Sequence, residues 1–360
     1  MKVLLLHPDL RAQGGVASYY EKLEKRYTQS IDHFVIGRRP DELGLYKKIF
    51  RLINDYRQFV VKMKKENYDI IHVNPSLDPK SFLRDGIFSL LARIYNKKTV
   101  VFFHGWDRSF AETIKNKRIW LFKLLYEKVN AFIVLADEFK IALKSFGCKQ
   151  PIFLEVIVLE DEVIRNFDIP LEIESRIKSE KKKILFISRI IKEKGIYEAI
   201  EAISILVKKY KNIELIVAGD GAELRNVISY VKEKSIPNII FAGYVTGEEK
   251  YNLINNSHLL CFPTYGEGFP NTIVEAMAFG LPIVTRPVGG IADFFKNGEH
   301  GFATVSKNPI DFANFMEKIL LDRELYRKIS LCNYQYGKEN FLASHAVLRL
   351  EKIYESVLSK

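Results

Sequence analysis

Two glutamates, Glu267 and Glu275, enclose a loop that leads from an expected strand, Leu259–Phe262, into an expected helix at 270–279. The proline at the start of this helix suits its position, because its missing N–H would have no partner there. The backbone N–H groups that follow, at 271–273, form a ready-made site for an anion. We therefore expect a phosphate-sized anion site between two carboxylates. Such a site suits a ligand with both phosphate and hydroxyl groups, for example a nucleotide sugar.

A cationic stretch, Ser188–Gly195, follows the expected strand Ile184–Ile187 and contains Arg189 and Lys194. A planar guanidinium and a compact ammonium can bind one phosphate group together, since the first forms paired hydrogen bonds and the second acts as a point charge. A solvated run of charges on an exposed helix is the alternative interpretation. The position of the stretch at the carboxyl end of a strand favours phosphate binding.

Two weaker candidates lie in the first half of the chain. Gly14 and Gly15 follow the expected strand Lys2–Leu6, where the absence of a Cβ lets the backbone approach a phosphate or a sugar. An ordinary tight turn between strand and helix explains them equally well. His104 follows the expected strand Thr99–Phe103 and could hydrogen-bond a sugar hydroxyl or a leaving phosphate. A loop histidine that is satisfied by the backbone is the alternative.

Two further strand ends in the second half carry signals of low specificity. Gly219–Ala222 lacks the third glycine of a dinucleotide-binding fingerprint, so we interpret it mainly as a turn, with a nucleotide base near it. Phe241–Val245, which contains Tyr244, offers main-chain groups and apolar side chains that could hold the base. A general acid–base pair formed by Glu267 and Glu275 is an alternative. The phosphate-binding features around that pair would then have no use.

The candidate residues follow strands in a regular alternation of short apolar runs and longer amphipathic segments. Continuous apolar strands separated by helices predict parallel sheets covered on both faces. The pattern restarts after a charged segment, Glu172–Lys183, that indicates a linker or a surface helix. The expected strands are Lys2–Leu6, His33–Ile36, Ile70–Val73, Thr99–Phe103 and Ala131–Leu135, then Ile184–Ile187, Glu214–Ala218, Ile239–Phe241, His258–Phe262 and Ile283–Thr285. Helices are expected near 15–27, 43–66, 80–95, 110–129 and 136–146, then near 195–210, 221–234, 246–255, 270–279, 308–320, 322–336 and 340–358.

The length of 360 residues allows two domains, each large enough for its own core. Open α/β sheets bind ligands beyond the carboxyl ends of their strands, so we expect the active site in a cleft where two such sheets face each other. The predicted domains are 1–165 and 166–342, each Rossmann-like, and residues 343–360 are expected to form a further helix.

Composition excludes several classes of protein. The chain is 48% hydrophobic and 28% charged, which argues against disorder, and no stretch approaches the roughly 20 apolar residues of a membrane span. The three cysteines are scattered and odd in number, so we expect reduced thiols rather than a disulfide framework. The first apolar run is too short for the core of a signal peptide. We therefore expect a cytoplasmic protein, at most peripheral at the inner face of the cell membrane.

The net charge of +11 is unevenly placed. Residues 1–150 hold 28 Lys and Arg against 16 Asp and Glu, whereas the rest of the chain holds 27 against 28. A basic domain favours nucleic acid, an anionic membrane surface or an anionic substrate, and charge alone does not choose among them. The basic residues gather in and before one expected helix and alternate with aromatic residues: Arg38, Arg39, Lys47, Lys48, Arg51, Arg57, Lys62, Lys64 and Lys65 with Tyr46, Phe50, Tyr56 and Phe59.

Taken together, these stretches resemble the retaining glycosyltransferases of family 4, which have the GT-B fold. The resemblance covers essentially the whole chain and is most specific at Glu267–Met277, where two glutamates enclose seven residues, followed by Gly280–Val284 and Gly289–Gly290. The segment Ser188–Gly195 fits as well, and so do the two glycines and the histidine of the first half. The resemblance implies an α/β fold of two doubly wound Rossmann-like domains that face each other across a cleft. The first domain, 1–165, would bind the acceptor and the second, 166–342, the nucleotide sugar, and the helix at 343–360 would pack back on the first domain.

The resemblance also implies roles for the candidates. Arg189 and Lys194 would bind the donor diphosphate and neutralise charge on the leaving nucleotide, and Glu275 would bind the ribose. Glu267 would hold hydroxyls of the donor sugar near the reacting carbon, and His104 would contact that sugar from the first domain. The remaining substrate-binding positions are Gly14, Gly15, Tyr244, Gly268, Phe269, Pro270, Asn271, Thr272 and Ile273. In this family the leaving phosphate helps to deprotonate the acceptor, so neither a metal nor another cofactor is expected, and the nucleotide sugar is a co-substrate.

The leading hypothesis is a glycosyltransferase that moves a sugar from a UDP- or GDP-sugar to a glycan or polyprenyl-linked glycan, in the synthesis of a bacterial surface polysaccharide (capsule, O-antigen or exopolysaccharide). We expect the basic helix to lie on anionic lipid, with a solvated helix face as the alternative. A phosphorylase or an epimerase of the same fold is an alternative enzyme. A nucleic-acid-binding protein is favoured only by the charge, and no nucleic-acid module is recognisable. The segment Glu155–Glu162 departs from the family, many of whose members have an Asn-Gly-Val-Asp-like turn there.

Overall fold

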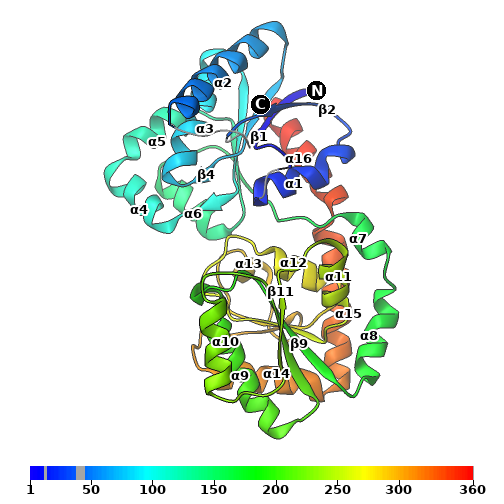
Figure 1. Ribbon diagram of the computed structural model, residues 1–360. Coiled ribbons are helices and arrows are strands. Elements are labelled where there is room, and N and C mark those ends of the chain that lie inside the picture. Colours follow the sequence, from blue (N-terminus) through cyan, green and yellow to red (C-terminus); the bar gives the residue numbers. More distant parts are fainter. Residues whose placement is uncertain (12–13, 38–44, 360) are drawn as a thin grey trace. The chain divides into compact units, whose positions relative to one another are not determined.

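The computed structural model describes residues 1–11, 14–37 and 45–359. The chain forms two compact units: unit 1 comprises Met1–Val156 and Ala343–Lys360, and unit 2 comprises Ile157–Leu342. Each unit is an α/β structure around a six-stranded parallel sheet (Figure 1). The boundary expected at 165 and 166 lies within unit 2 instead, at the end of helix α7 (Asp161–Arg165), because the chain leaves the sheet of unit 1 earlier.

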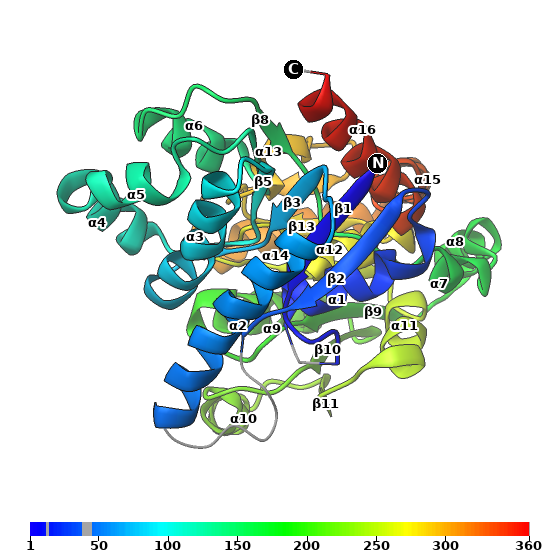
Figure 2. The same cartoon turned by 90° about the horizontal axis from the view of Figure 1, so that it is seen from above.

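Unit 1 has the strand order β2-β1-β3-β5-β7-β8, with every pair of neighbours parallel. Strands β3 and β7 are buried along their whole length, as expected for strands covered by helices on both faces. Helix α1 packs on α16, and α3 packs on both α5 and α2. The first turns of α2 extend away from the sheet (Figure 2). The elements are β1 Lys2–His7, α1 Gly15–Leu23, β2 Ser30–Val35, α2 Leu45–Lys65, β3 Ile70–Val73, β4 Ser76–Leu77, α3 Pro79–Ile94, β5 Lys98–Phe103, β6 Gly105–Trp106, α4 Arg108–Lys117, α5 Ile119–Tyr126, β7 Ala131–Val134, α6 Asp137–Ser145, β8 Ile152–Leu154 and α16 Ala343–Leu358.

Helix α16 belongs to unit 1, although the chain passes through unit 2 before reaching it. Its Arg349 forms an ion pair with the buried carboxylate of Glu155, with 2.5 Å between Nη2 and Oε1. Burial raises the pKa of Glu155, and the guanidinium opposes that shift. The segment that departs from the family pattern therefore begins, in this chain, with a residue that ties the C-terminal helix to unit 1.

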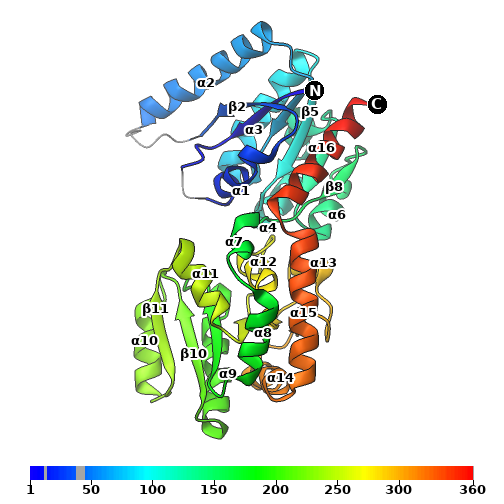
Figure 3. The ribbon, with the colours of Figure 1, turned by 90° about the vertical axis from the view of Figure 1, so that its right-hand side faces the viewer.

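Unit 2 has the strand order β11-β10-β9-β12-β13-β14 and is also parallel throughout. Counted along the chain, this order is 3-2-1-4-5-6, that of the doubly wound nucleotide-binding fold. Helices α9 and α14 pack together, and α15 packs on α12 and on α8, which lies beside it (Figure 3). The elements are α7 Asp161–Arg165, α8 Ile169–Lys178, β9 Lys182–Ile187, α9 Ile196–Lys209, β10 Ile213–Ala218, α10 Leu224–Glu233, β11 Ile239–Gly243, α11 Gly247–Asn255, β12 Leu259–Phe262, α12 Asn271–Ala278, β13 Ile283–Thr285, α13 Ile291–Phe294, β14 Gly301–Ala303, α14 Pro309–Leu321 and α15 Arg323–Asn340.

The structure corrects one expected element and decides between two alternatives for another. The single helix expected at 110–129 is two helices, α4 and α5, because Arg118 leaves the helical conformation (φ −132°, ψ 26°). For the charged segment Glu172–Lys183 the helix is confirmed rather than the linker, since most of the segment lies in α8. That helix starts where Asp168 accepts a hydrogen bond from the N–H of Leu171, as a helix N-cap does.

Among the described residues, no helix combines the length and the apolar character that a membrane span requires. The expected positions 43 and 44 of the long basic helix lie outside the described residues, as do Arg38 and Arg39.

Candidate functional site

The strand order of unit 2 brings two predicted stretches together. Strands β9 and β12 are neighbours, but the chain continues from β9 to β10 on one side and from β12 to β13 on the other. Open α/β sheets bind ligands at such a reversal, beyond the carboxyl ends of the strands. The segment Ser188–Gly195 follows β9 and Pro263–Pro270 follows β12, so both predicted phosphate-binding stretches lie at the reversal.

Backbone contacts hold these two loops against each other. The carbonyl of Glu193 accepts a hydrogen bond from the N–H of Tyr265 (2.9 Å), and Oγ1 of Thr264 lies 3.3 Å from the same oxygen. Gly195 has a left-handed backbone (φ 75°), and a Cβ on it would lie 2.1 Å from the carbonyl oxygen of Pro263. Glycine is therefore required at 195 both by its backbone conformation and by the close approach of the two loops.

Lys194 and Glu267 form an ion pair between these loops. The ammonium of Lys194 donates to Oε1 of Glu267, which also accepts from Oγ1 of Thr264 at 2.9 Å. Both charged side chains are only 11% exposed. Oε2 of Glu267 has no partner among the described residues, and it is not one of their enclosed, unpaired polar atoms. One oxygen of Glu267 is therefore open to a ligand hydroxyl while Lys194 stays paired.

Glu275, in α12, is paired with Lys250, a residue that the sequence analysis missed. The ammonium of Lys250, in α11, lies 2.6 Å from Oε1 of Glu275 and 4.8 Å from the ring centroid of Tyr251. Glu275 is only 5% exposed, yet its Oε2 is neither paired within the described chain nor enclosed. A buried carboxylate calls for a counter-charge. The need for a counter-charge to Glu275 is the only signal in the sequence that could have indicated a lysine here, and it does not indicate Lys250 in particular.

The first residues of α12 offer two backbone donors. The helix begins at Asn271 with Pro270 as its N-cap, one residue later than expected. The N–H of Ile273 donates to the carbonyl of Pro270 (3.2 Å), so the expectation that it is free was wrong. The N–H groups of Asn271 and Thr272 have no hydrogen-bond partner among the described residues. Oγ1 of Thr272 donates to the carbonyl of Ile187 (3.0 Å), which fixes the start of this helix at the end of β9.

Gly268 and Phe269 lie in the loop between Glu267 and helix α12. The carbonyl of Gly268 accepts a hydrogen bond from the N–H of Gly290 (2.6 Å), which holds the loop in place. The Phe269 side chain is buried and stacks on Phe294, with 5.2 Å between ring centroids. The side chain of Phe269 therefore belongs to the core.

Arg189 is the exposed cation at the reversal. Its guanidinium has no partner within the described chain, and its neighbour Ile190 donates its N–H to the carbonyl of Asp220 (2.8 Å). This bond holds the Arg189 loop against the loop after β10. Arg189 is therefore free to bind an anion without breaking an existing ion pair.

Tyr244 lies farther along the same edge of the sheet. It is 72% exposed and follows β11, which β10 separates from β9. The N–H of Gly219 donates to the carbonyl of Gly243 (2.6 Å), so the loops after β9, β10 and β11 form a continuous rim. The structure thus places Tyr244 on the rim but not next to the Lys194–Glu267 pair.

The unit 1 candidates also follow strands. His104 is held by its N–H, which donates to the carbonyl of Pro75 (3.1 Å), and by its ring, which stacks on Phe102 at 3.7 Å between centroids. Burial lowers the pKa of His104 well below its usual value, and His72 nearby lowers it further. A Cβ on Gly14 or Gly15 would meet no atom of the described residues within 4 Å.

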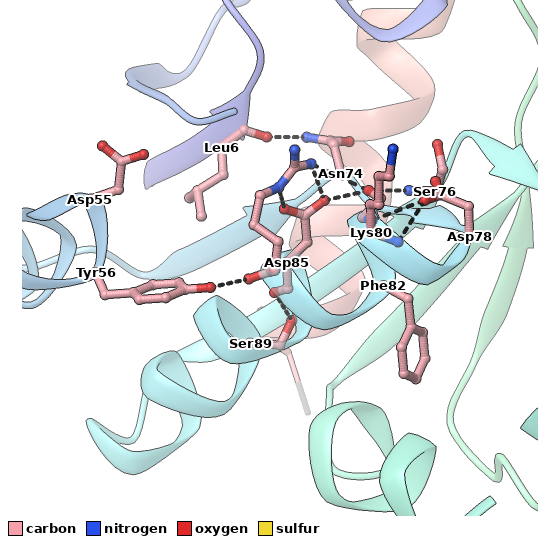
Figure 4. Close-up of polar contacts among 12 residues, drawn as sticks. Leu6, Asp55, Tyr56, Asn74, Ser76, Asp78, Lys80, Phe82, Asp85 and Ser89 are labelled. Atoms are coloured by element: carbon pink, nitrogen blue, oxygen red, sulfur yellow. Dashed lines mark hydrogen bonds and ion pairs between the residues drawn. The ribbon is translucent and has the colours of Figure 1, made fainter. Parts of the chain in front are cut away.

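A buried ion pair in α3 supports the loop after β3 (Figure 4). Asp85 is fully buried, and its carboxylate accepts from Nη2 of Arg84 (2.7 Å) and from Oγ of Ser81 (2.8 Å). Oγ of Ser81 in turn accepts from the N–H of Ser76 (2.9 Å). Burial raises the pKa of Asp85. This pair ties α3 to the strand β4, which pairs with β6 directly after His104.

Two family models match the chain, one in each half. The model described as "Glycosyl transferases group 1" matches residues 170–335, and the model described as "Glycosyltransferase Family 4" matches residues 11–154.

Characterised relatives match over part of their length. The capsular polysaccharide biosynthesis glycosyltransferase CapM of Staphylococcus aureus is 30% identical over 230 residues, which are 63% of this chain and 58% of the relative. The 2-deoxystreptamine N-acetyl-D-glucosaminyltransferase of Niallia circulans is 25% identical over 274 residues, which are 72% of this chain and 68% of the relative.

Two solved structures share the fold over nearly the whole chain. Anabaena HepE in complex with UDP and glucose has a TM-score of 0.71 and 16% identity, and covers 99% of this chain and 100% of its own. Sucrose-phosphate synthase from Thermosynechococcus elongatus has a TM-score of 0.75 and 17% identity, with 99% of each chain covered. The two family models identify the two halves of the chain as glycosyltransferase domains of family 4 and group 1, and the two solved structures show that its fold is GT-B.

Proposed function

We propose that the protein transfers a sugar, with retention of anomeric configuration and without a metal ion, from a UDP- or GDP-sugar to a glycan or polyprenyl-linked glycan. The observation that carries this proposal is the set of groups at the β9/β12 reversal. Within the described part of the chain, Arg189 and two backbone N–H groups of α12 have no partner, and Glu267 and Glu275 each present one open oxygen. Cations and N–H groups suit a diphosphate, and carboxylate oxygens suit ribose and sugar hydroxyls.

In this proposal unit 2 holds the donor and stabilises the leaving group. Negative charge develops on the phosphate oxygen as the glycosidic bond breaks, and Arg189, Lys194 and the start of α12 would stabilise it. Glu275 would bind the ribose, Glu267 the sugar hydroxyls, and the exposed rim that carries Tyr244 the base. Unit 1 would bind the acceptor near Gly14 and Gly15, and His104 would contact the donor sugar. HepE was solved with UDP and glucose, which supports a nucleotide-sugar donor.

A panel of UDP-, GDP- and ADP-sugars tests the proposal, with thermal shift and nucleotide release as readouts. One nucleotide is expected to stabilise the protein, and its sugar form is expected to release nucleotide at an undiminished rate in EDTA. Arg189→Ala should weaken nucleotide binding about tenfold or more, the scale of a charge-assisted hydrogen bond. Arg225→Ala is the matched control, because Arg225 is an equally exposed arginine of unit 2 on α10. If no nucleotide binds, or if both variants bind it equally, the proposed site is wrong.

The capsular polysaccharide relative in Staphylococcus aureus supports a pathway of surface polysaccharide synthesis, which would place the protein at the cytoplasmic face of the membrane. We propose that α2 is the part that contacts anionic lipid there. Tyr46, Ile49, Phe50 and Ile53 are spaced as on one helix face and are 82%, 49%, 73% and 60% exposed. Lys47 and Lys48 beside them are exposed too. An exposed apolar face flanked by lysines is typical of a helix that lies in a membrane interface.

The structure narrows the set of residues that can take part in this contact. Phe59 is buried and Tyr56 donates to the carbonyl of Arg84, so these two aromatics hold α2 to unit 1. Arg51 is paired with Asp55 at 2.8 Å, and Lys62 lies 3.7 Å from Asp32. The first half of α2 is therefore the surface to test.

Vesicle flotation at low salt tests the membrane contact. Vesicles with anionic lipid are expected to carry the protein, and neutral vesicles are not. The double change Lys47→Glu/Lys48→Glu should lower binding by more than tenfold, since each basic residue near the surface contributes about 1 kcal/mol. Phe50→Ser should also lower it, whereas Ile310→Ser, at an exposed apolar residue of unit 2, should not. Equal binding to both kinds of vesicle would rule the contact out.

A further inference from the structure

The ring of His104 ends a chain of hydrogen bonds inside unit 1. Its Nε2 lies 3.1 Å from Oδ1 of Asn74, the residue that follows β3. The same Oδ1 accepts from the hydroxyl of Tyr20 at 2.6 Å. Nδ2 of Asn74 lies 2.8 Å from the carbonyl oxygen of Leu6 in β1 (Figure 4). Asn74 is 3% exposed, so these partners account for its polar atoms without water.

The carbonyl of Leu6 decides how the amide of Asn74 is oriented. A backbone carbonyl only accepts hydrogen bonds, so the Asn74 atom that faces it must be the amide nitrogen. The other atom, which faces Tyr20 and His104, is then the amide oxygen, and this oxygen also only accepts. Nε2 of His104 must therefore carry the hydrogen of that contact.

The rest of the chain is consistent with this direction. The Tyr20 hydroxyl gives its hydrogen to Asn74, so its oxygen can only accept from Nε2 of His72, at 3.4 Å. Nδ1 of His72 then accepts from the hydroxyl of Tyr354 in α16, at 2.6 Å. Burial lowers the pKa of His72 to about 3, so at neutral pH its ring is uncharged and carries one proton. One ring proton on His72 is what these hydrogen bonds require. Each donor along the chain meets an acceptor.

Nδ1 of His104 is left as an open acceptor. Since burial keeps His104 neutral and Nε2 carries its proton, Nδ1 carries a lone pair. Nδ1 has no partner among the described residues and is not one of their enclosed, unpaired polar atoms, so solvent reaches it. An acceptor of this kind can bind a hydroxyl, but it repels the oxygens of a phosphate.

We propose that Asn74 is a positioning residue that holds His104 in the tautomer protonated at Nε2, so that Nδ1 accepts a hydrogen bond from a hydroxyl of the donor sugar. The tautomer follows from unit 1 alone, and only the identity of the bound hydroxyl rests on the proposed function. Of the two partners open for His104 in the sequence, a sugar hydroxyl or a leaving phosphate, this assignment selects the hydroxyl.

Nitrogen-15 NMR of the full chain with labelled histidine tests the tautomer directly. The chain has seven histidines, and the His104 signals are identified by their loss in His104→Gln. We expect Nε2 with a bound hydrogen and Nδ1 without one at neutral pH. A protonated Nδ1 in the unaltered protein would overturn the proposal, whatever any variant does.

Three variants test whether Asn74 is the cause. Asn74→Leu removes the acceptor and should let the second tautomer, protonated at Nδ1, appear. Tyr20→Phe removes one of the two contacts that orient the amide and should produce a smaller amount of the same signal. Tyr19→Phe is the matched control: the Tyr19 ring lies 5.2 Å from that of His104, but its buried hydroxyl has no partner among the residues that the structure describes. If Asn74→Leu leaves the same tautomer as Tyr19→Phe, Asn74 does not position His104.

Addition of UDP separates this inference from the proposed function. UDP carries the phosphates but no donor sugar, so it should shift signals of unit 2 and leave Nδ1 of His104 unprotonated. Protonation of Nδ1 on binding UDP would mean that His104 contacts phosphate, and it would overturn the hydroxyl assignment. A complete lack of UDP binding would count against the proposed function, while the tautomer measured in the free protein would still stand or fall by itself.

Discussion

The Lys194–Glu267 pair allows stability and catalysis to be separated in one set of variants. Lys194→Met and Glu267→Gln each remove one charge at nearly constant volume, and the double variant removes both. If the pair only holds the two loops together, the double variant should behave like the unaltered protein. If Lys194 stabilises the leaving phosphate, the double variant should be stable but inactive.

The expected loss of stability follows from burial. Each partner is only 11% exposed, so each single variant leaves a charge that water hardly reaches. Breaking a buried pair costs about 3–5 kcal/mol, and the residual exposure places this one near the lower end. For a unit of this size, about 3 kcal/mol corresponds to a fall in Tm of roughly 6–12 °C. The double variant should recover most of that loss, because replacing a whole buried pair is close to neutral.

An exposed pair in the same unit supplies the matched control. Lys209 and Glu317 are paired at 3.2 Å, but their side chains are 54% and 21% exposed. Lys209→Met should cost less than about 1 kcal/mol. Far-UV circular dichroism follows both units, whereas both tryptophans, Trp106 and Trp120, lie in unit 1. A shift seen by dichroism but not by tryptophan fluorescence therefore belongs to unit 2.

Turnover decides between the two roles. All variants that lack Lys194 should lose at least about 100-fold in kcat, the effect of removing one electrostatic stabiliser of a transition state. A Lys194→Met/Glu267→Gln protein with normal stability and normal turnover would refute the catalytic role of Lys194. A single variant that unfolds no more easily than Lys209→Met would refute the argument from burial.

Three further predictions follow from single contacts. Lys250→Met should weaken UDP binding about tenfold in calorimetry, because Glu275 loses the counter-charge that orients it. Lys234→Met, which breaks an exposed pair with Glu201, should leave UDP binding unchanged. Equal affinities of the two variants for UDP would remove Lys250 from the site. Gly195→Ala should lower the Tm much more than Gly298→Ala does. Both glycines have positive φ, but only at Gly195 would a Cβ lie against a carbonyl oxygen, that of Pro263. A similar loss in both variants would show that the close approach of Gly195 to Pro263 is unimportant. Burial lowers the pKa of His72 to about 3, so between about pH 6.5 and pH 3 the unfolded chain binds a proton that the folded chain excludes. The stability of unit 1 should therefore fall as the pH drops through this range. His72→Gln should flatten the dependence of stability on pH in tryptophan-monitored denaturation, and an unchanged dependence would contradict the lowered pKa.

The fold was largely predictable from the sequence because each sheet is parallel and buried. Such strands are continuous apolar runs, and the five expected in each half all lie in the two sheets. Four strands were missed. Strands β8 and β14 have three residues each at a sheet edge, where too few side chains are buried to leave a pattern, and β4 and β6 have only two residues each. The break between α4 and α5 was missed because no glycine or proline marks it.

The candidate site was predictable only where residues are close in sequence or follow a strand end. Arg189, Lys194 and the Glu267–Glu275 stretch lie after β9 and β12, whose neighbourhood follows from the fold. Lys250 and Asn74 could not be predicted in the same way. Each acts through one side-chain contact with a residue 25 or 30 positions away, and such contacts depend on rotamers and helix packing that no spacing rule encodes.

Glu267 and Glu275 share an arrangement that affects how a donor would bind. In each, a lysine donates to Oε1 while Oε2 stays open, so a ligand hydroxyl can be accepted without first breaking an ion pair. If the ligand had to displace the lysines, each exchange would leave a nearly buried ammonium without its partner, at a cost of several kcal/mol. A donor that adds to the existing pairs avoids this cost and meets carboxylates that are already oriented. Binding energy then remains for the diphosphate, where Arg189 is unpaired and where charge develops during transfer.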